Sequence, residues 1–360
     1  MDTAPIKLTS ARAWRTYIGG SQIDAIHGIE GSPDTQFPEE WIMSIVCARN
    51  PGREHIQNEG MSYLEGRDVS LKDYITADPS ATLGQAHGDK LGATTGVLVK
   101  IIDAGERLTI QAHPSREKSP VLFNSPFGKT ECWHILGGRT INGEEPCIYM
   151  GFKEGITRER WKEIFDTQDI PAMLDALHKF PVKAGETYLI CGGVPHAIGA
   201  GCLLIEIQEP TDYTVRTERI TPAGLHIVDA QCHQGLGFEK MFDVFEYDGL
   251  DQEQAYSRWC IPPTVLEETA DYTRREVIGY GQTDCFRMER YDITGTCRFP
   301  GSDRFSGLYI LSGSGSIAGE EGSQNICGGD QFFVPATSKD FTVTADGSPV
   351  TLFRCFGPEL

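Results

Sequence analysis

The sequence predicts a mainly β protein with about two domains. Its length of 360 residues suits about two domains of ordinary size. The 40 glycines and 20 prolines supply many turns. The apolar residues come mostly in short runs bounded by such turn residues, which is typical of short strands. A hydrophobic content of 39% is enough for a sizeable core.

In the first half, apolar runs predict strands at residues 41–47, 96–102, 108–113, 131–136, 148–152, 187–190 and 202–207. Ser70 can cap a short helix. Thr157 and Asp169 can cap two more helices, which we interpret as a small helical insertion near residues 157–180. The insertion offers apolar stripes for packing and no side chains that suggest chemistry.

The second half reads as a smaller all-β unit. Short strands are predicted at residues 286–291, 307–311, 315–317, 330–335 and 350–355. Residues 248–270 are acidic and weakly patterned, and we interpret them as a linker. We therefore expect a first domain at residues 1–247, and the linker with a C-terminal domain at 248–360.

A short internal sequence repeat suggests that both halves share one β architecture. Residues 184–190 followed by Val194 and Pro195 resemble residues 329–335. His196 follows the first copy, whereas Ala336 follows the second, and no histidine occurs after His233. Only the first half could then hold a site with several histidines, and we expect the C-terminal domain to bind no metal.

Charge and cysteine usage exclude several function classes. A net charge of −19 argues against general binding to nucleic acid or to an anionic membrane. No apolar run is long enough to span a membrane, and the N-terminus lacks a secretory signal pattern. The 11 cysteines are odd in number and form no Cys-x-x-Cys pair, so free thiols in a reducing cytoplasm are expected.

Four residues are candidates for a metal site. Gln111 and His113 alternate along a predicted strand, so they share one face. Glu131 begins another strand, and His196 lies in a Gly/Pro-marked turn between two strands. Histidine nitrogens with carboxylate and amide oxygens are common metal ligands. A lone histidine beside a strand is more often a surface or core residue, so the spacing by itself identifies these residues only as candidates.

Several ordered motifs resemble those of one enzyme family. They are Thr109-Ile-Gln-Ala-His-Pro114, Gly128-Lys-Thr-Glu-Cys-Trp133, Val194-Pro-His-Ala197, and Asp212 four residues before Arg216. Together they resemble the type I phosphomannose isomerases (mannose-6-phosphate isomerases), and most closely the short bacterial form. The similarity runs from about Trp41 to Arg216 and more loosely through the C-terminal unit. The long helical insertion of eukaryotic members is missing.

The resemblance implies a fold of two cupin-type (jelly-roll) β-barrels with one zinc ion in the first. It implies that the zinc ligands are His113, Glu131 and His196, with Gln111 matching a ligand of longer members. Arg216 matches the proposed catalytic arginine, and Glu206 and Asp212 match pocket carboxylates. Thr109 and Lys129 are expected to contact substrate. The family's phosphate-contacting residue after the arginine has no clear match, although Arg219 is nearby.

The implied activity is zinc-dependent interconversion of mannose 6-phosphate and fructose 6-phosphate through an enediol-type intermediate. Two other classes stay open: an iron oxygenase on a cupin scaffold, which metal content would identify, and a sugar-binding sensor without turnover, which an isomerase assay would identify. Another sugar also stays open as the substrate. The sequence leaves undecided the oligomeric state and which residue transfers the proton.

Overall fold

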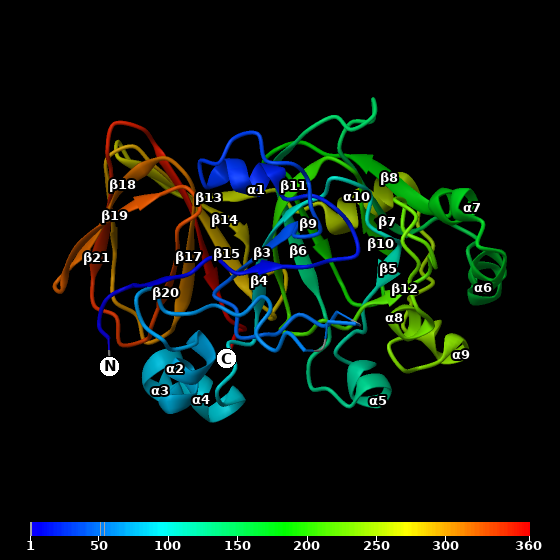
Figure 1. The fold of residues 1–360 in the computed structure, drawn as a ribbon, viewed down its shortest axis with the longest axis horizontal. Helices are drawn as coiled ribbons and strands as arrows, with labels where there is room; N and C mark the ends of the chain where they lie inside the picture. Colours follow the sequence, from blue (N-terminus) through cyan, green and yellow to red (C-terminus); the bar gives the residue numbers. More distant parts are fainter. Residues whose placement is uncertain (1, 51, 54) are drawn as a thin grey trace.

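The chain folds into two β-rich halves that lie side by side along its longest axis (Figure 1). The structure is a computed structural model that describes residues 2–50, 52–53 and 55–360. Each half consists of two antiparallel sheets, and the C-terminal half occupies the left of Figure 1. The mainly β prediction is confirmed.

The first half contains a six-stranded and a five-stranded sheet. The order in the larger sheet is β2 (Arg12–Ala13), β3 (Glu39–Ile42), β4 (Leu98–Asp103), β11 (Cys202–Gln208), β6 (Glu131–Gly138) and β9 (Thr187–Ile190). The order in the smaller sheet is β12 (Val215–Arg216), β5 (Gln111–Ala112), β10 (His196–Ile198), β7 (Cys147–Phe152) and β8 (Leu177–Pro181).

The second half contains a seven-stranded and a four-stranded sheet. The order in the larger sheet is β1 (Ile6–Leu8), β20 (Gln331–Val334), β17 (Ser306–Ser312), β22 (Val350–Phe356), β15 (Arg287–Ile293), β14 (Tyr272–Ile278) and β13 (Thr264–Glu268). The order in the smaller sheet is β16 (Thr296–Phe299), β21 (Phe341–Ala345), β18 (Ser314–Gly319) and β19 (Gly322–Cys327).

The two halves repeat one strand order. In the larger sheets, β4-β11-β6-β9 corresponds to β15-β22-β17-β20. In the smaller sheets, β5-β10-β7-β8 corresponds to β16-β21-β18-β19. Each half is therefore the same eight-strand jelly roll of two facing sheets. The sequence repeat between the segments at β9 and β20 reflects this duplication, because the two strands occupy equivalent positions in the two larger sheets.

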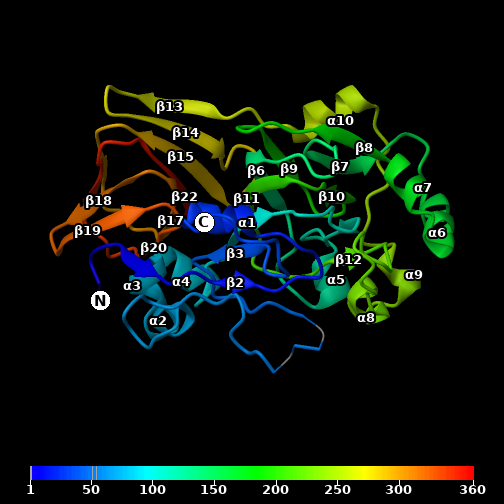
Figure 2. The same cartoon turned by 45° about the horizontal axis from the view of Figure 1, so that its top comes forward.

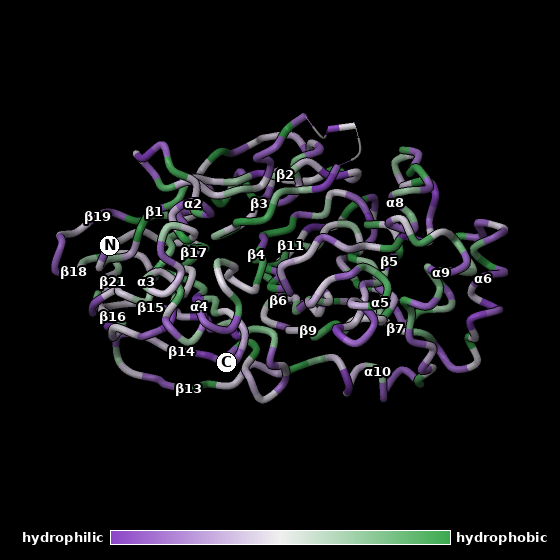
Figure 3. The backbone as a smooth tube through the Cα atoms, turned by 90° about the horizontal axis from the view of Figure 1, so that it is seen from below, coloured by the Kyte–Doolittle hydropathy of each residue, from purple (hydrophilic) through white to green (hydrophobic). Residues whose placement is uncertain are grey.

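The larger sheets of the two halves pack against each other. Their shared core includes Val99 and Ile205 from the first half and Tyr309 and Phe353 from the second. Hydrophobic stretches run along β4 and β9 near the middle of the molecule, whereas the turn between β18 and β19 is hydrophilic (Figure 3). The second half thus covers an apolar face of the first, and separating the halves would expose it to water.

Ten helices of the described residues surround the sheets. They are α1 (Ser21–Ile26), α2 (Leu71–Ala77), α3 (Pro79–Leu83), α4 (Gln85–Leu91), α5 (Ser119–Phe123), α6 (Arg158–Thr167), α7 (Ile170–Asp175), α8 (Asp229–His233), α9 (Phe238–Met241) and α10 (Gln252–Trp259). Ser70, Thr157 and Asp169 accept hydrogen bonds from the first turns of α2, α6 and α7, which confirms these predicted caps. Within the described ranges, no helix is long and apolar enough to cross a membrane.

Some predicted boundaries were wrong. The strand predicted to reach residue 47 ends at Ile42, because Met43 adopts a positive φ of 53° that leaves the extended region. The strand predicted at residues 108–113 is only β5, which has two residues. The helical insertion ends at Asp175, and Leu177–Pro181 forms strand β8 instead.

The predicted linker is also structured. Residues 248–270 contain α10 and β13, and α10 begins with a capping box between Asp251 and Gln254. Trp259 at the end of α10 lies against Gly151, where a side chain would clash with its ring. The N-terminal strand β1 pairs with β20 of the second half, so the N-terminus lies beside that half (Figures 1 and 2). The chain therefore crosses between the halves at its start as well as near residue 260.

Candidate metal centre and pocket

Strand register brings three predicted site residues into one row on the five-stranded sheet. Gln111 of β5 pairs with His196 of β10 on one side and with Arg216 of β12 on the other. Directly paired residues point to the same face of a sheet and lie close together. The three side chains therefore project together toward the six-stranded sheet.

The facing six-stranded sheet supplies two further rows. Glu206 of β11 pairs with Lys100 of β4 and with Trp133 of β6. Two residues further along, Gln208 pairs with Glu131. Because side chains alternate between the faces of a strand, both rows project to the same side. The Trp133 indole N–H donates to Glu206 Oε2 at 2.9 Å and fixes its carboxylate.

His113, Glu131 and His196 form a compact buried cluster between the two sheets. His113 Nε2 lies 3.1 Å from Glu131 Oε2, and His196 Nε2 lies 3.3 Å from Glu131 Oε1. One potential ligand atom from each residue lies within 4.8 Å of the others, and none of the three side chains is more than 1% exposed. The structure therefore brings together the three metal ligands that the sequence suggested.

The hydrogen bonds of the two histidines place each imidazole proton on Nδ1, away from the centre of the cluster. His113 Nδ1 lies 2.8 Å from the carbonyl oxygen of Tyr213, and His196 Nδ1 lies 2.8 Å from that of Val194. A carbonyl only accepts, so each Nδ1 carries the proton and each Nε2 presents a lone pair. Both Glu131 oxygens and His196 Nε2 are buried without a hydrogen-bond partner. Acceptors facing one another in this way fit a bound cation.

The local electrostatics favour the same protonation states. Burial and the nearby Lys129 ammonium lower the pKa of His113 to about 3. Burial also lowers the pKa of His196. Burial alone would raise the pKa of Glu131, but the charge of Lys129 holds it well below its usual range. Neutral imidazoles and an ionised carboxylate are the forms that bind metal.

In the second half, phenylalanines fill the equivalent place. Phe299 of β16 pairs with Phe341 of β21, as Gln111 pairs with His196 in the first half. The two phenyl rings stack with centroids 4.9 Å apart. Aromatic hydrocarbons offer no ligand atoms, which is a physical reason to expect that the second half binds no metal.

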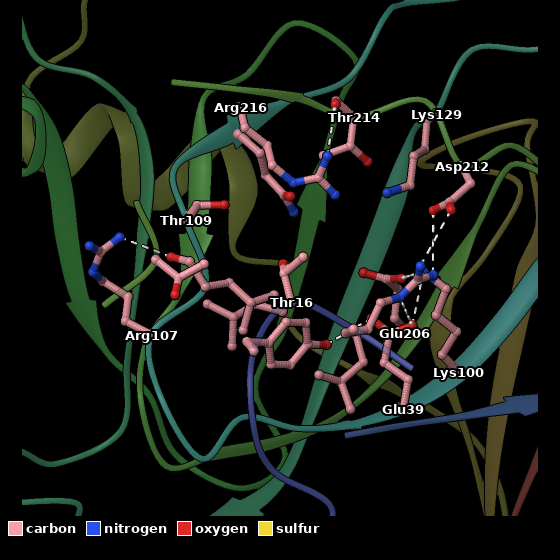
Figure 4. A pocket seen from close by; sticks show the side chains of 17 residues that line it. Thr16, Glu39, Lys100, Arg107, Thr109, Lys129, Glu206, Asp212, Thr214 and Arg216 are labelled. Carbon is pink, nitrogen blue, oxygen red and sulfur yellow. Dashed lines mark hydrogen bonds and ion pairs between the residues drawn. The ribbon is translucent and has the colours of Figure 1, made fainter. Parts of the chain in front are cut away.

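A pocket of about 580 Å³, measured out to its open mouth, lies beside the cluster. Six residues predicted for the site line it: Thr109, Gln111, Lys129, Glu206, Asp212 and Arg216. Figure 4 shows Arg216 and Lys129 directing their cationic ends into the pocket. That Gln111 is a metal ligand stays a prediction, which its pairing with His196 on the neighbouring strand supports.

Lys129 is buried and does not behave as an exposed turn lysine. Its Nζ lies 3.0 Å from His113 Nε2 and 3.4 Å from Glu131 Oε2. Arg216 donates to the carbonyls of Thr214 and Gln231 at 3.3 Å and 3.1 Å. Among the residues that the structure describes, Arg216 has no carboxylate partner, so its charge is available to a bound anion.

The structure places Arg219 outside the pocket. Its guanidinium lies 4.5 Å from the ring centroid of Phe238, and its Nη2 lies 3.7 Å from Asp229. It is absent from the residues that line the pocket. The structure therefore gives no support to the expected substrate contact of Arg219, because stacking on Phe238 turns the side chain away from this pocket.

Sequence analysis missed four charged residues of the pocket wall, which are Arg15, Glu39, Lys100 and Arg107. Arg107 pairs with Glu218 at 2.6 Å. Lys100 Nζ contacts Glu206 Oε1 at 2.9 Å and lies 4.0 Å from Glu39. Arg15 Nε contacts Glu39 at 2.9 Å, and the Arg15 guanidinium also faces Asp212. A lysine inside the apolar run at residues 96–102 was a usable signal, since a buried lysine in a strand needs a partner. Arg15 carried no comparable signal.

The pocket carboxylates differ in charge state. Burial and the negative charge of Glu131 raise the pKa of Glu206, which Lys100 only partly offsets. Burial would raise the pKa of Asp212, but Arg15 and Lys100 lower it to about 2. Burial would also raise the pKa of Glu39, but the charges of Arg15 and Lys100 lower it to about 2. The pocket thus holds one carboxyl group suited to exchanging a proton and two fixed anions.

Fold and site together define a two-domain cupin protein with a candidate metal centre in its first domain. Two family profiles match the chain: phosphomannose isomerase type I, catalytic domain, over residues 54–127, and mannose-6-phosphate isomerase, cupin domain, over residues 277–353. Both halves of the chain are therefore similar to the type I phosphomannose isomerases, and the chain is an isomerase.

Relatives with these names cover most of the chain. A protein named "Probable mannose-6-phosphate isomerase GmuF" from Bacillus subtilis (strain 168) is 27% identical over 253 residues, which are 70% of this chain and 73% of the relative. A mannose-6-phosphate isomerase of Streptococcus mutans is 24% identical over 72% of this chain and 74% of its own length.

Solved structures show the same fold over nearly the whole chain. The mannose 6-phosphate isomerase from Bacillus subtilis aligns with a TM-score of 0.74 and 21% identity, over 98% of this chain and 99% of its own. A mannose 6-phosphate isomerase bound with zinc and yttrium aligns with a TM-score of 0.71 and 15% identity, over 99% of this chain and 100% of its own.

Proposed function

We propose that the chain interconverts mannose 6-phosphate and fructose 6-phosphate. The observation that carries the proposal is the buried His113–Glu131–His196 cluster, whose acceptor atoms face one another beside a pocket that holds both carboxylates and an unpaired arginine, Arg216. An aldose–ketose isomerisation needs charge stabilisation and a proton carrier, and the pocket offers side chains for both tasks. The names of the relatives agree with this substrate pair.

One zinc ion per chain is proposed at His113, Glu131 and His196, with Gln111 as a fourth ligand. Two imidazole nitrogens and a carboxylate suit zinc, and the buried atoms without hydrogen-bond partners support a cation there. When bound, the ion would supply Lewis-acid stabilisation of negative charge on the sugar oxygens. The free thiols of all 11 cysteines, which lie within the described residues, agree with the expected cytoplasmic location.

Glu206 is proposed to carry the proton. Its raised pKa brings it closer to the operating pH than Asp212, and Trp133 and Lys100 hold its two oxygens in place. Glu206 removes the proton from C2 of the open-chain aldose and returns a proton to C1. The proton of the C2 hydroxyl moves to the C1 oxygen, so atoms and electrons balance.

The other polar residues bind and orient the substrate. Asp212, held as a carboxylate, accepts hydrogen bonds from sugar hydroxyls, and Thr109 contributes a hydroxyl at the pocket wall. Arg216 stabilises the negative charge of the enediolate. Lys129 acts at the C1–C2 end, because its ammonium lies beside the proposed metal ligands.

A coupled assay tests the proposal. Fructose 6-phosphate formation from mannose 6-phosphate is measured with untreated, chelator-treated and zinc-restored protein, and with free mannose as a second substrate. We expect activity that chelator abolishes and zinc restores, with mannose 6-phosphate preferred. No conversion by metal-loaded protein would refute the isomerase, and would favour the sugar sensor. Iron found in place of zinc would favour the oxygenase class.

A further inference from the structure

Asp212 is held in the pocket by a residue from a distant part of the chain. It lies in the segment between β11 and β12, and its carboxylate oxygens lie 3.5 Å from Nη1 and Nη2 of Arg15. The backbone N–H of Arg49 approaches Oδ2 at 3.4 Å. Among the described residues, Arg15 is the only side chain that forms an ion pair with Asp212.

Arg15 is itself fixed on several sides. Its Nε contacts Glu39 Oε2 at 2.9 Å, and its guanidinium lies 5.0 Å from the ring centroid of Trp41. Its side chain is 9% exposed, so the guanidinium has little room to turn. Nε of the planar guanidinium is therefore used by Glu39, and both Nη groups face Asp212, while Nη1 also lies 3.5 Å from Asn50 Oδ1. A lysine, with a single ammonium, could not make both contacts.

The segment that carries Arg15 is anchored to both halves. Ile6–Leu8 forms β1 on the seven-stranded sheet, and Arg12–Ala13 forms β2 on the six-stranded sheet. The Arg15 N–H then donates to the carbonyl of Gln36 at 2.9 Å. The second half of the chain thus holds the strand that leads directly into the pocket.

We propose that Arg15 is a positioning residue that aims the Asp212 carboxylate into the pocket. The inference rests on the proposed function for what Asp212 then does to the sugar. The other cations that face Asp212 are Lys100, Lys129 and Arg216, and none of them is paired with it. These three cations act on Asp212 only through their charge, whereas Arg15 also orients the Asp212 carboxylate through contacts from its two Nη atoms. Through β1, the second half contributes to the geometry of a site that contains none of its own residues.

A double-mutant cycle tests this role. Arg15→Met should lower kcat/KM for mannose 6-phosphate on the order of 10²-fold, because a misdirected orienting group has that cost. In the Asp212→Asn background the same change should cost nothing further, since the group that Arg15 positions has lost its charge. Arg15→Lys, which keeps the charge, should recover only part of the loss. The matched control is Arg12→Met, because Arg12 lies on the same segment but pairs with Asp24 outside the pocket.

Two results would overturn the inference. If the effect of Arg15→Met is unchanged by Asp212→Asn but disappears in Glu39→Gln, Arg15 acts through Glu39. If a crystal structure of Arg15→Met shows Asp212 in its original position, Arg15 does not position it. The crystal structure is informative even if wild-type protein fails to convert mannose 6-phosphate, so failure of this inference and of the proposed function are distinguishable. Should Arg15→Met not fold, the cycle and the crystal structure use Arg15→Lys.

Discussion

Replacing Arg216 by alanine separates charge stabilisation from structure. The guanidinium projects into the pocket, donates only to two backbone carbonyls and has no carboxylate partner among the described residues. If it stabilises charge that develops during the reaction, its loss should lower kcat while KM changes little. Losing one such contact in a water-poor site costs about 10²–10³-fold in kcat, equivalent to about 2.7–4 kcal/mol.

The structural cost of the same change should be smaller. Arg216→Ala leaves the carbonyls of Thr214 and Gln231 without this donor, and one buried unsatisfied group costs about 1–3 kcal/mol. Thermal unfolding therefore reports the structural loss, and steady-state kinetics at saturating mannose 6-phosphate reports the catalytic one. A protein that remains folded at the assay temperature yet has lost kcat by the expected factor would support the role.

Arg219→Ala is the matched control. Arg219 lies three residues further along the chain, and its guanidinium stacks on Phe238 outside the pocket. We expect its kcat and KM to stay near wild type. The reasoning would be refuted if both variants lost kcat equally, or if Arg216→Ala lost stability but kept its kcat.

Four further predictions follow from the geometry. His196→Ala should lower the bound zinc measured by elemental analysis, whereas His134→Ala should keep it, because His134 faces away from the cluster; equal zinc in both would contradict the ligand assignment. Chelator should remove zinc without unfolding the chain, as circular dichroism would show. Lys129→Met should reduce turnover of mannose 6-phosphate and of free mannose by similar factors, since its ammonium lies near C1 and C2; a loss confined to the phosphorylated sugar would place it at the phosphate. Burial holds the pKa of His134 at about 4, below its ordinary 6.5, so the unfolded chain binds a proton in this window that the folded chain does not. Stability should therefore fall as pH drops from 6.5 to 4, by about 3 kcal/mol for this group, and urea unfolding of His134→Gln should show a smaller fall than wild type.

Much of the fold could be predicted from local patterns. Strands such as Thr187–Ile190 and Cys202–Gln208 are apolar runs between turn residues, so their positions followed from composition. The caps at Ser70, Thr157 and Asp169 were visible because capping depends on one side chain and the next turn. Strands and helix caps can be predicted from the sequence where contacts between neighbouring residues decide the structure.

The errors came from contacts between distant residues. The helix α10 was missed although Asp251 and Gln254 form a capping box. Most of its residues are polar, and the two buried residues, Ala255 and Trp259, are too few to give a clear apolar pattern. Strand β1 was not expected at all, since three residues gain their partner only from β20. No local pattern identifies such a pairing.

The candidate site divides in the same way. His113, Glu131 and His196 could be predicted because their side chains are chemically distinctive and sit at strand ends. The wall residues Lys100 and Arg15 become functional candidates only when sheet register and ion pairs bring them to Glu206 and Asp212. Arg219 was assigned by nearness in sequence to Arg216, whereas its aromatic neighbour decides its direction.

The pairing of β1 with β20 has a consequence for protein synthesis. Ile6 lies opposite Phe333, so β1 leaves the ribosome long before its partner strand has been synthesised. Closing so long a loop is slow. The nascent first half can assemble its histidine cluster early, but Arg15, which follows β1, reaches its final position only after β20 has been synthesised and has paired with β1. Newly made protein should therefore acquire zinc before it acquires full activity.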